Sequence, residues 1–218
     1  MLIAGFEFLL KGGPVMWPLF ICALASVAII VERYIALRAV RRLGQGLVLE
    51  TKKALMEGRD RIAVNFLETR GGPVARLLLT AVKHRGLPQA HLESLIDEVA
   101  VEETPLLARG LGVLDTIITI APLLGLLGTV TGMIKAFQVV AISTGMSAPA
   151  AITGGVAEAL IATATGLAIA IVTLVGYNYL SDQVKAVVSD MEIAATKIVN
   201  TLTSLNAPTE ERYETARV

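Results

Sequence analysis

The chain has 218 residues, of which 54% are hydrophobic and 17% are charged, and its mean hydropathy is +0.67. Its 19 basic and 19 acidic side chains give a formal net charge of zero, so nothing indicates nucleic-acid binding or an acidic substrate. A soluble domain of this length could bury a core, but it would not need three uncharged stretches of nearly bilayer length. The composition therefore predicts a membrane protein that lies in a lipid bilayer.

Three apolar segments, each long enough for a bilayer crossing of about 20 residues, predict transmembrane helices. We therefore expect an all-α, polytopic membrane protein with three transmembrane helices and a cytoplasmic helical region. The expected parts are an N-terminal periplasmic segment (1–12), the first span (13–34), a cytoplasmic helical loop (35–110), the second span (111–141), a short periplasmic connector (142–151), the third span (152–181), and a cytoplasmic C-terminal helix with a tail (182–218).

Helical periodicity also marks the segments outside the spans. It covers 37–69, 73–85 and 89–103, with glycine- and proline-containing breaks between them. The stretch 184–205 has apolar residues at roughly helical spacing and is expected to pack on the others as a helix.

Orientation follows from the basic residues. Apart from Lys11 and Lys135, they lie at the end of the first span or in the loop and tail that follow the first and third spans. The positive-inside rule makes that side cytoplasmic, so the N-terminus is expected in the periplasm.

Glu158 is the feature of the sequence with the clearest functional meaning. It is the sole charged side chain between Lys135 and Asp182, and uncharged runs long enough to cross a membrane flank it. A carboxylate at membrane depth is costly and usually faces a cavity or partner along an ion path. The alternative is that Glu158 lies at a helix end and reaches the headgroups.

Small and polar residues pattern the second span. Gly125, Gly128 and Gly132 offer a small surface on which another helix can pack closely. At 100° per residue, a second, polar-tinged stripe forms on one face, and it consists of Asp115, Thr119, Leu126 and Thr129. The Thr129 hydroxyl could instead bond to its own helix backbone.

The third span carries Glu158 and Thr165 on one face, whereas Thr163 is rotated by about 140° from Glu158. One helix therefore cannot direct Glu158 and Thr163 at one point. An oligomer could use both, one in a central cavity and the other against a neighbouring helix.

No enzyme or cofactor motif accompanies this pattern. His84 and His91 are separated by Gly86 and Pro88, and no cysteine or carboxylate cluster completes a metal site. Walker, GxSxG and HExxH patterns are not found in the sequence. We expect no enzymatic activity, no cofactor and no metal.

Two motifs resemble the MotA/TolQ/ExbB proton-channel family, most closely its ExbB and TolQ branch. They are Ala-Pro-Leu-Leu-Gly-Leu-Leu-Gly-Thr-Val at 121–130 and Ala-Glu-Ala-Leu-Ile-Ala-Thr-Ala at 157–164. By that resemblance Thr129 and Thr163 match pore threonines, and Glu158 matches the membrane glutamate. Asp115 and Thr165 are secondary pore candidates added from helix geometry.

The resemblance implies a multi-pass protein of the bacterial inner membrane that forms a homopentamer. It implies a single-span ExbD- or TolR-like partner with a membrane aspartate, present as a dimer in the pore, and a TonB- or TolA-like transducer. Such a complex converts proton motive force into work on envelope or outer-membrane partners. The alternatives are a passive oligomeric membrane scaffold and a flagellar-type stator subunit.

Overall fold

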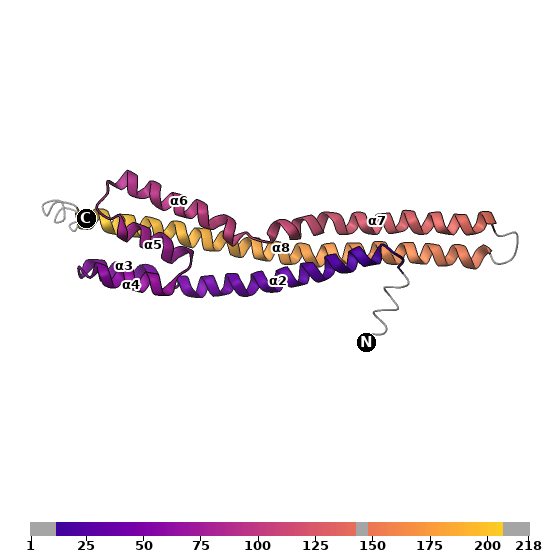
Figure 1. Ribbon diagram of the computed structural model, residues 1–218, viewed down its shortest axis with the longest axis horizontal. Helices are drawn as coiled ribbons and strands as arrows, with labels where there is room; N and C mark the ends of the chain where they lie inside the picture. The colour runs from indigo at the N-terminus through magenta and orange to yellow at the C-terminus, as the bar shows by residue number, and fades with distance from the viewer. Residues whose placement is uncertain (1–11, 143–147, 207–218) are drawn as a thin grey trace, which may run out of the picture. The chain divides into compact units, whose positions relative to one another are not determined.

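The computed structural model describes residues 12–142 and 148–206, and in these ranges the secondary structure is helical, without strands. The predicted all-α class is therefore confirmed. The expected N-terminal segment 1–12, the centre of the connector and the end of the tail lie outside the described residues, except for Gly12. In chain order the helices are α2 (Met16–Gly44), α3 (Leu47–Met56), α4 (Asp60–Arg70), α5 (Pro73–Lys83), α6 (Gln89–Leu107), α7 (Leu111–Ile142) and α8 (Ala148–Asn206) (Figure 1).

Three segments of the described chain are long and apolar enough to cross a membrane. They are Met16–Met56, which includes α2, Leu111–Gln138, which lies in α7, and Thr153–Leu205, which lies in α8. The chain divides into two compact units, each described separately below. The first unit comprises 1–33 and 110–180, and the second comprises 34–109 and 181–218. The helices α2 and α8 each contribute residues to both units.

Small residues bring α7 and α8 together in the first unit, where the two helices run side by side (Figure 1). A Cβ placed on Gly125 would lie 3.0 Å from Thr163 Cα, and one on Gly132 would lie 3.0 Å from Ala159 Cβ. At Gly166 an added Cβ would overlap the carbonyl oxygen of Ala121. Glycine at these positions therefore allows backbone-to-backbone packing that a larger residue would prevent.

The first unit has a core but also a strongly apolar exterior. A buried cluster joins the start of α2 to α7 and α8, and its members are Val15, Met16, Leu19, Ile117, Ala121 and Ala170. On the outside, Ile21, Ile171 and Val175 are each more than 60% exposed. An apolar surface of this kind needs lipid or further helices to cover it.

Two glycines divide the N-terminal part of the second unit into short helices. The periodicity expected over 37–69 is shared among the end of α2, α3 and α4, because Gly46 and Gly58 have φ of 78° and 67°. This left-handed conformation ends a helix, and glycine adopts it at little steric cost. At the C-terminus the expected helix over 184–205 is not a separate element. It is the continuation of α8, which runs without interruption from the third span.

Leucine packing and ion pairs hold the second unit together. Leu47, Leu67, Leu77 and Leu78 are each at most 1% exposed. Lys83 Nζ lies 2.9 Å from Glu68 Oε1, which links α5 to α4. Arg76 pairs with the buried Glu103, which links α5 to α6.

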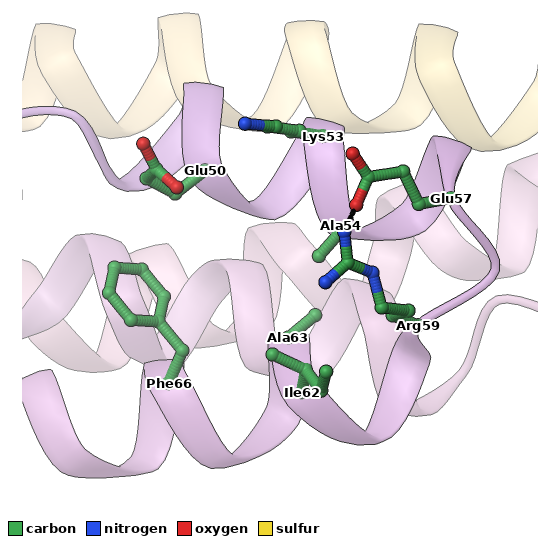
Figure 2. A pocket seen from close by; sticks show the side chains of 8 residues that line it. All are labelled: Glu50, Lys53, Ala54, Glu57, Arg59, Ile62, Ala63 and Phe66. Atoms are coloured by element: carbon green, nitrogen blue, oxygen red, sulfur yellow. Dashed lines mark ion pairs between the residues drawn. The ribbon is translucent and has the colours of Figure 1, made fainter.

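The helices α3 and α4 also border a small hollow of about 180 Å³, which Figure 2 shows from close by. Glu50 and Glu57 balance Lys53 and Arg59 around it, and Arg59 pairs with Glu57. With its charges balanced, this hollow has no clear preference for a charged ligand.

The close contact at Gly166 can be tested by adding one methyl group. We expect Gly166→Ala to lower the free energy of unfolding by about 1–3 kcal/mol, because the clashing atom belongs to the backbone and cannot rotate away. Gly154→Ala is the matched control on α8, since a Cβ there would meet nothing within 4 Å. It should be neutral, or stabilising by up to about 1 kcal/mol. Unfolding in detergent followed by circular dichroism measures both, and equal losses would contradict the packing described.

Candidate functional site

The carboxylate of Glu158 forms an ion pair with a lysine of the neighbouring helix. Lys135 Nζ of α7 donates to Glu158 Oε1 of α8 across 2.8 Å. The Glu158 side chain is 25% exposed and that of Lys135 is 49% exposed. The acidic group is therefore partly enclosed by the protein, and its lysine partner is the more exposed of the two.

The turn before α2 lies against the same carboxylate. A Cβ added to Gly13 would overlap Glu158 Oε1. The backbone of Gly13 also has φ of +76°, a conformation that disfavours every side chain. Glycine at this position therefore lets the chain pass close to the carboxylate, so that three segments of the protein meet at Glu158.

Pairing is the usual way for a protein to keep two charges in a membrane span. An isolated ionised side chain near the bilayer centre costs several kcal/mol, and such residues commonly pair with one another. Removing one partner leaves the other as an uncompensated charge. Lys135 and Glu158 are thus energetically linked.

Thr163 joins the same two helices at a second level. Its Oγ1 donates a hydrogen bond of 2.9 Å to the carbonyl oxygen of Gly125. Gly125 is also where the backbones approach closely, so the hydroxyl reaches across without a long side chain. Thr163 therefore faces α7, on the inner side of the helix pair.

The two further threonines proposed from the sequence for the pore bond within their own helices. Thr129 donates to the Leu126 carbonyl at 2.6 Å, and Thr165 donates to the Ile161 carbonyl at 2.8 Å. Each hydroxyl keeps lone pairs that can accept a further hydrogen bond. In the single chain, Thr129 therefore bonds to the backbone of its own helix, which was the alternative considered in the sequence analysis.

The polar stripe of α7 lies on its open side. Asp115, Thr119 and Leu126 are exposed, and Thr129 is half-buried. Within the described contacts, no hydrogen bond joins Thr129 or Asp115 to Glu158. The structure brings together Glu158, Lys135 and Gly13 at one level and Thr163 with Gly125 at another, and it leaves the stripe free for other contacts.

Sequence reasoning missed Lys135 and Gly13. Lys135 precedes the connector by about as many residues as Glu158 follows it, so a helical hairpin places the two at the same level. That signal was available in the sequence. Gly13 carried no comparable signal, because its role depends on where the start of α2 packs.

Comparison with known proteins shows which family the chain is similar to. Residues 69–193 match the family described as the MotA/TolQ/ExbB proton channel family. The chain is 32% identical to the biopolymer transport protein ExbB-like 3 of Synechocystis over 170 residues, which is 78% of this chain and 81% of that protein. It is 33% identical to ExbB-like 1 of Synechocystis over 86% of this chain and 77% of that protein. It is 30% identical to the biopolymer transport protein exbB1 of Vibrio cholerae over 78% of this chain and 75% of that protein.

The fold and the site define a helical membrane protein with three candidate spans and an acid–base pair between two of them. The chain belongs to the MotA/TolQ/ExbB proton channel family, and it is ExbB-like. The sequence resemblance to that family is therefore confirmed. The family is one of proton channels and transport components.

Two matched variants can distinguish the stability contributed by the Thr163 hydrogen bond between helices from that of a bond within one helix. Thr163→Val should lower the free energy of unfolding in detergent by about 0.5–1.5 kcal/mol, because it removes a contact between α7 and α8 at nearly constant volume. Thr165→Val is the matched control two residues along α8, and it removes only a bond to the same helix. If Thr165→Val lowered the free energy of unfolding as much as Thr163→Val, the hydrogen bond between the helices would contribute no more to stability than a bond within one helix.

Proposed function

We propose that this chain is the proton-channel subunit of an inner-membrane motor, which converts proton motive force into work on envelope or outer-membrane partners. Relatives named as biopolymer transport proteins support an energising role of the ExbB and TolQ kind. The observation that carries the proposal is Glu158, an ionisable group within a membrane span that is held by an opposite charge on the next helix.

The physical requirement for such work is a site that can take up and release a proton. A proton crossing a membrane potential of about 100 mV yields about 2.3 kcal/mol. Glu158 supplies a carboxylate that can bind that proton. Because the carboxylate contacts α7 and the turn at Gly13, binding a proton there would change how these segments pack. Changes of charge at Glu158 then act directly on helix packing.

Threonines near Glu158 are proposed to continue the path that the proton follows. Thr163 and Thr129 are the proposed pore residues beside Glu158, with Asp115 and Thr165 as secondary candidates. The exposure of the Asp115–Thr129 stripe in the single chain supports a place on a surface shared with other subunits or with a partner. The packing role proposed for Gly125, Gly128 and Gly132 is supported by the short distances across the helix pair.

The partners and location follow from the family. We propose a homopentamer with a dimer of a single-span ExbD- or TolR-like protein in its pore, whose membrane aspartate supplies a second carboxylate. A TonB- or TolA-like transducer would receive the work. The basic residues of the second unit support a cytoplasmic location for that unit and a periplasmic N-terminus.

The first functional test removes the charge of Glu158 with little change of shape. Complex purified through a tag on this chain, with its co-purifying partner, is reconstituted into vesicles that contain a pH-sensitive dye. Glu158→Gln should reduce proton flux by about 100-fold or more, the scale of a positioned proton-transfer group. Glu192→Gln, at an exposed position of α8, should leave flux unchanged.

Full flux in Glu158→Gln would remove Glu158 from the proton route. Lost assembly, without a separate defect in the complexes that do form, would favour the passive scaffold.

The second functional test counts subunits. Three spans of one chain cannot enclose a pore, and the apolar exterior of the first unit needs covering. We expect native mass spectrometry of the detergent-purified complex to give five copies of this chain. A stable monomer would contradict the ring.

A further inference from the structure

Within the ranges 12–142 and 148–206, the ion pair that Glu158 forms is the one with Lys135. On the α7 side the charged group facing the carboxylate is Lys135, and on the side of α2 the chain presents Gly13. One turn before Lys135, a Cβ on Gly132 would lie 3.0 Å from both Ala159 Cβ and Gly155 O. The close approach of the backbones at Gly132 is what brings the lysine within reach of the residue next to Ala159.

We propose that Lys135 is a positioning residue for Glu158, which holds the ionised carboxylate against α7 while the turn at Gly13 closes a second side. This inference rests on the proposed function, because it assigns the lysine a part in proton handling beyond the assembly of two helices. When a proton binds, a carboxylate oxygen becomes a neutral hydroxyl, and Lys135 keeps its charge but loses its ion-pair partner. The contact between α7 and α8 therefore responds to each proton that Glu158 binds or releases.

The same reconstituted flux assay tests the lysine. We expect Lys135→Met to lower proton flux about tenfold, which corresponds to about 1.4 kcal/mol. Lys135→Arg, which keeps the charge, should stay within about twofold of the unchanged protein. Lys185→Met is the matched control, because Lys185 forms an exposed ion pair with Asp182 on the same helix and should not matter for flux.

The glycine has an equally close control. Gly13 and Gly46 have φ of +76° and +78°, so an alanine strains the backbone equally at both. Only at Gly13 would the new Cβ meet Glu158, since at Gly46 it would meet nothing within 4 Å. Gly13→Ala should lower flux severalfold, and Gly46→Ala should not.

The outcomes separate the two proposals. If Glu158→Gln abolishes flux while Lys135→Met keeps it, the proposed function stands and the role of Lys135 is overturned. If Glu158→Gln keeps full flux, the proposed function itself fails.

Should Lys135→Met fail to assemble, Lys135→Gln tests the inference instead. A glutamine amide can still donate a hydrogen bond to the Glu158 carboxylate, but it carries no charge. Assembly with flux lowered about tenfold supports Lys135 as the residue that positions the carboxylate. Assembly with full flux would show that the contact only joins the two helices, and would overturn the inference.

Discussion

The close approach of α7 and α8 is the constraint on which the candidate site depends. In lipid, apolar side chains gain little by leaving the hydrocarbon, so helices associate through packing and a few hydrogen bonds. The glycines at 125, 132 and 166 let the two backbones come within contact distance. Only at that separation can the short side chain of Thr163 reach a carbonyl on the other helix. Replacing small residues with large ones would therefore disturb the polar contacts before it disturbed the helices themselves.

Much of the fold could be predicted because a bilayer allows few alternatives. Backbone groups in lipid must be satisfied internally, so long uncharged runs predict helices and even their approximate ends. Outside the bilayer that constraint is absent, and the detail was harder to predict. Asp182 marks where charge resumes, but a helix need not end where it leaves the membrane, and α8 continues to Asn206. Conversely, Gly46 and Gly58 end helices inside a stretch whose apolar periodicity is helical.

The sequence of each helix could predict single residues of the candidate site, but not the contacts between residues of different helices. Glu158 stands out because a lone acid in an apolar run is costly, whatever surrounds it. Its partner depends on the register between two helices, which periodicity along one helix cannot give. Lys135 was not paired with Glu158 in the sequence analysis, although the two residues lie at matching distances from the connector. Thr163 was recognised through family resemblance, but its hydrogen bond to Gly125 follows from helix separation, which the sequence does not contain.

The proposed role requires a contact between Glu158 and Lys135 that the energy of one proton can open. A fully exposed ion pair contributes about 0–1 kcal/mol, too little for its loss to move a helix. A buried charge left without its partner costs about 3–5 kcal/mol, more than one proton supplies at about 100 mV. Glu158 and Lys135, with side chains 25% and 49% exposed, lie between these limits. In the proposed role, a contact between these limits is of the same order as the roughly 2 kcal/mol that a single proton delivers at about 100 mV, so one proton would be enough to open it.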